Sequence, residues 1–493
     1  MTMNRHLWIF TAPILILAAG KVCAEGNFIN IGGSEPEGMV VPFSEQDLEA
    51  DAQIAAPVED EEAKLLTEFA RFKQLVNDGA FDEADSVAKR VIELAIITKG
   101  AQSPEMAKAL TNLAIVQHRT RQFDAAQQNY QSAIEIIEEV EDRLNEQLVN
   151  PLKGLAAAQL DSGRPDLASR TYRRAVHVTH VNDGPHNFGQ ISLLEDLAEV
   201  QLRMGEPDRA KEVQDTIYAL NVRAFQLDSL ELIPALMRRA DWQHRAGFIF
   251  DERATYRRVL RIIEGKLGRN NLALVEPLVN LGKTFFYADT SGQSSFHEAQ
   301  LSTGEIYFKR ALRIAAESPD SNWYIIANAT LALGDYYMQD GNPHRARQVY
   351  RNAWVLLSES EGDINKLEMR RTELEGTVNL RQRPLPPFVG KTNPASEATV
   401  EDPVLEGTIR VTYNISDRGR VADLKLEEAL PLEFTDMQNA VQREVRRRIF
   451  RPTFADGEPV ASTGHEFVHI FYYRKSDLEA AQAAAAAAAS EET

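Results

Sequence analysis

The apolar positions of the chain keep a helical period over most of its length, and the pattern repeats at a fixed distance. A pair of a large residue and Ala or Gly marks the first helix of each unit, at Leu113-Ala114, Leu155-Ala156, Leu197-Ala198, Arg239-Ala240, Leu281-Gly282 and Leu333-Gly334. A second marker, usually aromatic, stands at Tyr130, Tyr172, Gln214, Tyr256, Phe308 and Tyr350. Both ladders advance by 42 residues except for one step of 52. The sequence therefore predicts an array of helix–turn–helix units.

Gly and Pro separate the helices of these units. In segments such as 162–165 and 204–207, Gly suits a left-handed helix end and Pro suits the first turn of the next helix. We expect the first two helices at 62–78 and 81–97, about seven helix pairs up to 358, and a capping helix at 364–380. The predicted solenoid spans 62–380. The 52-residue step predicts a ten-residue insertion around 287–303.

The hydrophobic period changes from helical to two at the C-terminal end. Residues 408–415 and 421–426 alternate polar and apolar positions on either side of a turn at 417–420, as half-buried strands do. A helical period follows over 434–449, and a last strand is predicted at 464–473. The order β-β-α-β predicts a small α+β unit over 404–475, so the fold class is mainly α. We expect the Pro-rich residues 381–403 to be a linker, and we assign no function to the Ala-rich tail 476–493.

The N-terminus has the features of an export signal. Arg5 precedes the apolar run Leu7–Leu17, and Val22-Cys23-Ala24 ends it with small residues. This pattern predicts a signal peptide at 1–24 that is cleaved after Ala24. A retained membrane anchor is the alternative, although the apolar run is shorter than a spanning helix needs. Cleavage would remove Cys23, the single cysteine. Residues 25–61 form a predicted acidic, flexible lead-in.

The charge balance and the missing motifs exclude several functions. The chain of 493 residues carries a formal net charge of −19, which argues against a general nucleic-acid binder. We find no phosphate-binding glycine loop in a strand-to-helix context and no nucleophile elbow. His177, His180 and His186 form the only local histidine cluster, and they lack carboxylate ligands at helical spacing. We therefore predict no enzyme, no cofactor, no metal site and no small-molecule substrate.

The repeat unit resembles tetratricopeptide (TPR) repeats. The resemblance rests on Leu-Ala/Gly in the first helix, Gly-x-Pro at the turn, and Ala-x3-Tyr/Phe-x2-Ala in the second helix. The period of 42 is similar to the longer type found in kinesin light chains. Such arrays bind protein segments along one surface. The candidate groove residues are Lys153, Glu195, Glu199, Arg238, Asp241 and Arg245. Their mixed charges leave open a solvated face with ion pairs.

The C-terminal unit resembles the C-terminal domain of TonB-type energy transducers. Gly407 with Ile409 and Val411, Gly419-Arg420-Val421, the run 448–452, and 456–460 carry the resemblance. In that family the last strand lies at a sheet edge and pairs with a segment of an outer-membrane receptor. The resemblance implies that the partner-binding edge consists of Gly464, His465, Glu466, Phe467, Val468, His469, Ile470, Phe471 and Tyr472.

These features combine into one functional hypothesis with two alternatives. We expect a periplasmic scaffold or adaptor that binds envelope proteins, with a TonB-like domain that pairs its edge strand with an outer-membrane receptor in energy-dependent transport. The expected partners are TonB-dependent receptors or other components of a TonB system. The first alternative is an inner-membrane-anchored energy transducer that uses residues 7–20 as its anchor. The second is a structural assembly platform without a transport role.

Overall fold

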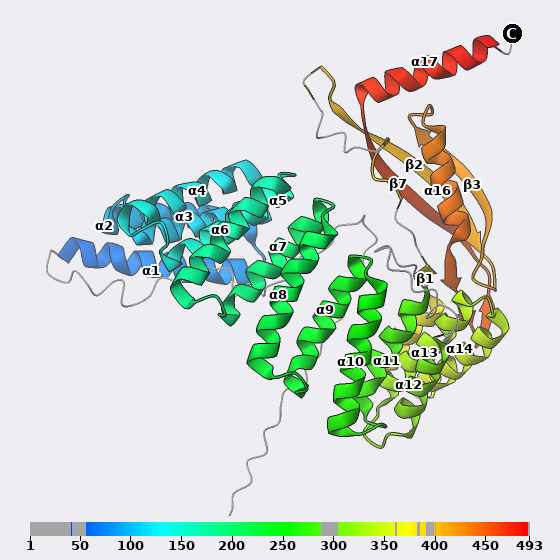
Figure 1. Ribbon diagram of the computed structural model, residues 1–493. Helices are drawn as coiled ribbons and strands as arrows, with labels where there is room; N and C mark the ends of the chain where they lie inside the picture. Colours follow the sequence, from blue (N-terminus) through cyan, green and yellow to red (C-terminus); the bar gives the residue numbers. More distant parts are fainter. Residues whose placement is uncertain are drawn as a thin grey trace, which may run out of the picture. The chain divides into compact units, whose positions relative to one another are not determined.

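The computed structural model describes residues 41, 56–286, 304–359, 362–381, 385–390, 399 and 401–491. They belong to two compact units, Met1–Asn182 and Asp183–Thr493 (Figure 1). The expected signal peptide at 1–24 and the expected insertion at 287–303 lie outside the described residues. Among the residues that are described, no helix has both the length and the apolar character needed to cross a membrane.

The first unit consists of consecutive helices. They are α1 (Ala56–Asn77), α2 (Phe81–Lys99), α3 (Pro104–Arg119), α4 (Phe123–Val140), α5 (Val149–Asp161) and α6 (Pro165–Asp183). Helix α1 begins at Ala56, before the predicted start at 62, so the end of the predicted flexible lead-in is helical. Leu65 and Phe72 of α1 are buried in the core that this helix forms with α2 and α3.

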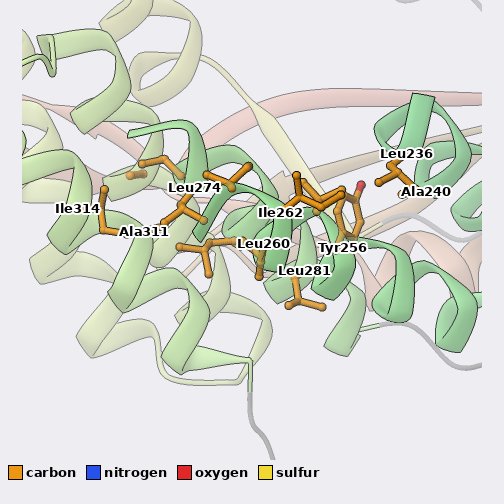
Figure 2. Close-up of a cluster of buried hydrophobic side chains, with 14 of the residues drawn as sticks. Leu236, Ala240, Tyr256, Leu260, Ile262, Leu274, Leu281, Ala311 and Ile314 are labelled. Carbon is orange, nitrogen blue, oxygen red and sulfur yellow. The ribbon is translucent and has the colours of Figure 1, made fainter. Parts of the chain in front are cut away.

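The helix pairs continue through the first part of the second unit. They are α7 (Ile191–Arg203), α8 (Pro207–Phe225), α9 (Ile233–Arg245), α10 (Ile249–Leu267), α11 (Val275–Lys283), α12 (Glu305–Glu317), α13 (Trp323–Gln339) and α14 (Pro343–Ser358). The described residues of both units thus contain seven helix pairs, as the repeat ladders predict. Figure 2 shows part of the core between α9 and α12, where Tyr256 packs among leucine and isoleucine side chains.

The marker residues of the ladders are packing residues. A Cβ atom added at Gly154 would lie 2.3 Å from Cζ of Tyr130, and one added at Gly334 would lie 2.3 Å from Cε1 of Tyr350. Phe308 approaches Gly282 in the same way, at 2.5 Å. A small residue on one helix thus receives an aromatic ring from a neighbouring helix. The contacts of Gly282 with Phe308 and of Gly334 with Tyr350 lie within one helix pair and join the two ladders, whereas Gly154 receives Tyr130 from the preceding pair.

A short 3-10 turn before the first helix of four repeats accompanies the long period. These turns are Glu146–Leu148, Phe188–Gln190, Leu230–Leu232 and Leu272–Leu274, again 42 residues apart. Three are capped by an asparagine whose Oδ1 accepts the N–H two residues on, at 2.9 Å for Asn145, 2.7 Å for Asn187 and 3.0 Å for Asn271. Such Asx turns order a connection that would otherwise be a loose loop. The turns are therefore an ordered part of each repeat connection.

The C-terminal sheet has the strand order β3-β2-β7 and is antiparallel. Its strands are β2 (Val404–Ile415), β3 (Val421–Leu430) and β7 (Ser462–Arg474), and α16 (Thr435–Arg447) lies against one face (Figure 1). Met437, Val441 and Val445 of α16 share a core with inward-facing residues of β2. The predicted β-β-α-β order is therefore present.

Two predicted helices at the C-terminal end need correction. Short strands β4 (Ile449–Arg451), β5 (Thr453–Ala455) and β6 (Glu458–Val460) lie between α16 and β7, so the predicted helix 434–449 is too long. The predicted capping helix 364–380 is also too long. It consists of α15 (Ile364–Arg370) and a π-turn (Arg371–Glu375), and residues 378–381 form β1, because their main chain pairs with β4.

The predicted linker is in part bound to the sheet. Arg381 ends β1, and Phe388 forms a parallel bridge with Tyr472 of β7. In this bridge Tyr472 N donates to Pro387 O, and Val389 N donates to Tyr472 O, both at 2.9 Å. The described residues 385–390 are therefore fixed by main-chain hydrogen bonds and do not form a free tether. After β7, α17 (Lys475–Glu491) makes most of the Ala-rich tail helical.

The strand region and the last repeat share one hydrophobic core. The ring of Phe454 lies 6.0 Å from Tyr350 and 6.2 Å from Trp354, both on α14. Ile449 belongs to the same buried cluster. The C-terminal α+β unit is therefore packed onto the solenoid and is not an independent domain on a linker.

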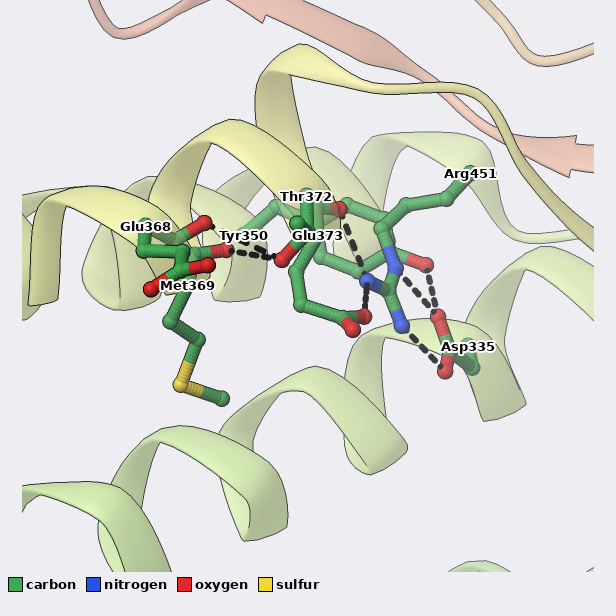
Figure 3. A network of polar contacts seen from close by, with 7 residues as sticks. All are labelled: Asp335, Tyr350, Glu368, Met369, Thr372, Glu373 and Arg451. Carbon is green, nitrogen blue, oxygen red and sulfur yellow. Dashed lines mark hydrogen bonds and ion pairs between the residues drawn. The ribbon is translucent and has the colours of Figure 1, made fainter. Parts of the chain in front are cut away.

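A buried ion pair reinforces this joint (Figure 3). Arg451 is 5% exposed, and its Nε and Nη2 each donate to a carboxylate oxygen of Asp335 on α13 at 2.9 Å. Its Nη1 donates to the main-chain oxygen of Glu373 at 2.7 Å and to Oε2 of the same residue at 2.6 Å. Burial alone would lower the pKa of Arg451, but the charge of Asp335 outweighs it and the pKa is raised. The guanidinium is therefore held charged between the repeat and the sheet.

Candidate protein-binding surfaces

The predicted groove residues lie in both units. Lys153 is on α5 of the first unit, and the other five are on α7 and α9 of the second. There Arg245 joins two acidic residues, because its Nη1 lies 2.6 Å from Glu199 Oε2 and its Nε lies 3.3 Å from Asp241 Oδ2. Burial would lower the pKa of Arg245, but the hydrogen bond to Glu199 outweighs this effect and the pKa is raised. The structure thus brings three of the six candidates together.

Glu195 and Arg238 form a second pair, with Oε1 and Nε 3.4 Å apart. Both residues line a cavity of about 20 Å³ together with the buried side chains of Gln214 and Asn221. This volume holds about one water molecule, so the cavity is too small for a peptide side chain. The charges on α7 and α9 are thus mutually compensated, which matches the ion-pair alternative for these five residues.

The first unit contains a contact that the sequence did not indicate. Asn112 on α3 is 2% exposed, and its amide bonds both main-chain groups of Val41. Val41 N donates to Asn112 Oδ1 at 2.8 Å, and Asn112 Nδ2 donates to Val41 O at 3.1 Å. A side-chain amide that bonds both the N–H and the C=O of one residue recognises its main chain. The identity of that residue's own side chain does not matter for this contact. The one available signal was a polar residue directly before the Leu113-Ala114 marker.

Strand β7 is an edge of the C-terminal sheet, and half of its main-chain groups point away from β2. The main-chain N–H and C=O of Tyr472 bond the segment 387–389, so these groups of Tyr472 point away from β2. The register between β2 and β7 is continuous from Tyr473 to His465. Because outward and inward residues alternate in an antiparallel ladder, the N–H and C=O of Glu466, Val468 and Ile470 also point outward. The described residues contain no main-chain partner for the outward N–H and C=O groups of these three.

The two faces of β7 differ in chemistry. Val468, Ile470 and Tyr472 expose 38%, 48% and 44% of their surface on the face away from α16. His465, Phe467 and His469 alternate with them and are partly buried on the other face. Burial lowers the pKa of both histidines, so they are mainly neutral at pH 7. Of the predicted edge residues, Tyr472 is already paired within the chain, and Gly464 N donates to Asn414 Oδ1 at 3.2 Å. His469 Nε2 also lies 2.9 Å from Pro386 O. The open main-chain groups of the edge are therefore the outward ones of Glu466, Val468 and Ile470.

The described residues contain no group of three or more His, Cys, Asp or Glu side chains placed to bind a metal ion. His177 and His180 both lie on α6. The two candidate surfaces are the main-chain contact at Asn112 and the open edge of β7.

Comparison with known proteins identifies the repeats. Residues 63–139 and 105–179 match the family model described as tetratricopeptide repeat. The helix pairs over 63–179 are therefore tetratricopeptide repeats, as their ladder predicts, and repeats of this class bind other proteins. No curated protein matches the chain.

Several solved structures are similar to parts of the chain. Kinesin-light-chain TPR-like repeats from Podosopora anserina share 14% identity, cover 41% of this chain and 97% of their own, and give a TM-score of 0.37. BtubC (BKLC) from P. vanneervenii shares 15% identity, with coverages of 57% and 93% and a TM-score of 0.28. The C-terminal part of a TPR repeat-containing protein from Cytophaga hutchinsonii shares 11% identity, with coverages of 61% and 99% and a TM-score of 0.36.

Proposed function

We propose that this chain is an exported protein-binding scaffold whose C-terminal sheet adds a strand from a cell-envelope protein along β7. The observation that carries the proposal is the pairing of Phe388 with Tyr472. The chain's own extended segment already forms a parallel bridge on this edge, so the edge accepts an added strand at one end. The adjoining Glu466, Val468 and Ile470 offer the same outward main-chain groups, and these groups bond no described residue.

Strand addition suits this edge for physical reasons. Main-chain hydrogen bonds supply affinity, and the alternating side chains supply specificity. The exposed Val468 and Ile470 would be covered by apolar side chains of the partner, and the Arg410 side chain on the same face is held by Glu428 and Glu466. An open edge of this kind is normally protected in a protein that does not use it.

The tetratricopeptide repeats would bind partners independently of the sheet. The bonds of Asn112 to both main-chain groups of Val41 support a groove in the first unit that holds extended chain. A scaffold with two such surfaces can hold two proteins at once, which is the role we propose for the chain in the periplasm.

The finer proposal is that the strand partner is a TonB-dependent outer-membrane receptor in energy-dependent transport. Its support is the resemblance of 404–475 to TonB C-terminal domains, whose characteristic residues have clear roles here. A Cβ at Gly407 would lie 2.4 Å from Cζ of Phe471, and one at Gly419 would lie 2.0 Å from Phe450 O. Both glycines are thus required for the sheet to close over its core.

Two alternatives remain open to experiment. A membrane-anchored transducer would keep residues 7–20 as an anchor, whereas the proposed scaffold would begin at Glu25. Mass spectrometry of the mature chain from the soluble and membrane fractions distinguishes the two. The second alternative, an assembly platform without a transport role, predicts no binding of receptor segments.

A pair of substitutions at Val468 tests strand addition. Val468→Pro removes the outward N–H and leaves the bonds to β2, because proline is tolerated at an edge. Val468→Thr keeps that N–H and serves as the matched control. We expect labelled peptides from the periplasmic N-terminal segments of the host's outer-membrane receptors to bind the Thr variant within about twofold of wild type and the Pro variant at least about tenfold more weakly. Equal binding by the two variants would show that strand addition is wrong.

A further inference from the structure

The amide of Asn112 in the first unit holds a residue that precedes the helices. Val41 N donates to Asn112 Oδ1 at 2.8 Å, and Asn112 Nδ2 donates to Val41 O at 3.1 Å. Asn112 is 2% exposed and lies on α3, whereas Val41 comes before α1, which begins at Ala56. A buried amide of the repeats is therefore bound to the main chain of the protein's own N-terminal part.

The repeat ladder shows why this amide is available. Asn280 stands at the same position of a later repeat, four periods of 42 residues on. There its side chain hydrogen-bonds to Tyr256, the aromatic marker 24 positions earlier. The residue 24 positions before Asn112 is Ala88, which is buried and has neither a ring nor a hydroxyl. The tyrosine that bonds Asn280 is thus replaced by alanine in the first repeat, and the amide of Asn112 bonds Val41 instead.

The sequence around Val41 suits this contact. Pro42 follows Val41, and a residue before proline is restricted to extended conformations. In an extended residue the N–H and the C=O point to the same side of the chain, so one planar amide can bond both. Pro42 has no N–H that could compete for the amide oxygen. The site therefore favours a residue that stands directly before a proline.

We propose that the segment at Val41 is a built-in occupant of the site at Asn112, and that a partner binds the first unit by displacing it. The partner is an extended protein segment that presents a residue directly before a proline. Because occupant and site belong to one chain, the effective concentration of the occupant is about 1 mM. This inference rests on the proposed binding of partners by the repeats, and it adds the chemistry of the partner and a competitor that limits access.

The test uses the full chain and a fluorescein-labelled peptide with the sequence of residues 36–46. Fluorescence anisotropy gives the dissociation constant of this peptide. Val41→Pro in the chain removes the N–H that bonds Asn112 and so weakens the occupant, whereas Val41→Thr keeps every main-chain group and is the matched control. We expect the peptide to bind Val41→Pro at least about tenfold more tightly than wild type, and Val41→Thr within about twofold of wild type.

Two further measurements place the peptide at Asn112. Asn112→Asp keeps the shape of the side chain but replaces the Nδ2 donor by an oxygen, which repels the main-chain oxygen of the bound residue. Added to Val41→Pro, it should weaken binding of the peptide at least about tenfold. Amide hydrogen exchange of Val41 in wild type needs no substitution at Asn112, and it should be at least about tenfold slower than in the free peptide.

The outcomes separate this inference from the function on which it rests. Equal binding by wild type and Val41→Pro that Asn112→Asp abolishes would show a site for extended chain without a built-in occupant, which overturns the inference alone. Val41 exchange as fast in the chain as in the free peptide would also overturn it. Binding by Val41→Pro that survives Asn112→Asp would overturn the role of Asn112. If the peptide binds no variant, the proposed binding of extended chain by the repeats fails, and the inference fails with it.

Discussion

The joint between the last repeat and the C-terminal sheet depends on Arg451, and Arg451→Met is the sharpest test of that joint. The substitution keeps most of the side-chain length and removes the charge. It deletes two bonds of 2.9 Å to Asp335 and two bonds, of 2.6 and 2.7 Å, to Glu373. Asp335 keeps one partner, because Tyr350 Oη donates to it at 2.7 Å.

The expected cost follows from burial. Removing one partner of a buried ion pair costs about 3–5 kcal/mol, chiefly because the other charge stays desolvated. Arg451 is 5% exposed, but Asp335 is 22% exposed and Glu373 is 38% exposed. Water can therefore reach both carboxylates in part, which places the cost at the lower end, about 3 kcal/mol.

Amide hydrogen exchange measures this cost locally. Phe450, next to Arg451 in β4, donates its N–H to Gly419 O at 2.9 Å, so its exchange reports opening of the chain beside the joint. A loss of about 3 kcal/mol corresponds to exchange that is about a hundredfold faster. Arg447→Met, at an exposed position, should leave the rate unchanged, and adding Asp335→Asn to Arg451→Met should recover part of the protection. Less than a threefold change in Arg451→Met would refute the reasoning.

Two other predictions concern the repeats. Gly154→Ala should destabilise the first unit by about 1–3 kcal/mol in urea unfolding, because the new Cβ would overlap Tyr130. The control Gly265→Ala has open space around it on α10 and should stabilise the protein by up to about 1 kcal/mol. Equal effects of the two substitutions would contradict the role of Gly154 in packing. The hydrogen bond to Glu252 raises the pKa of His244, so its stabilisation is fully present below about pH 6.5 and is lost as the pH rises through the raised pKa. The Tm difference between wild type and His244→Gln should therefore be largest near pH 6 and shrink by pH 9, and a difference that grows with pH would contradict the assignment.

The sequence predicted the repeats well, because their determinants are local. Gly282 and Phe308 belong to the two helices of one repeat, as do Gly334 and Tyr350 of the next, so the same contact recurs along the chain. The predicted ladders also include Gln214 and Arg239, which differ from the residue types usual at their positions. In the structure Arg239 compensates, since its Nη1 donates to Gln214 O at 3.3 Å and its guanidinium lies 4.5 Å from the ring centroid of Tyr218.

Predictions failed where a distant partner decides the structure. Val378 forms a strand because it pairs with Arg451, more than 70 positions away, and no local period carries that information. Pro387 lies in a segment whose composition indicates extended chain, but composition does not reveal the strand to which it bonds. The predicted capping helix in front of Val378 is present at its start, but the prediction extended it too far along the chain.

The candidate sites show the same limit. Arg448 and Arg451 stand in one run of arginines. Both are buried because α16 ends at Arg447, after which the extended chain turns both side chains inward. The groove charges lie on α7 and α9, the first helices of successive repeats, but side-chain pairing could not be predicted from spacing.

The open edge of β7 is the centre of this account, and residue-resolved hydrogen exchange tests it directly. With a labelled receptor peptide bound, the amides of Glu466, Val468 and Ile470 should become protected by at least about tenfold. The amides of Phe467 and His469 should not change, because they already face β2. That alternating pattern is the result that strand addition predicts. Unchanged exchange at the three outward amides under saturating peptide would contradict it.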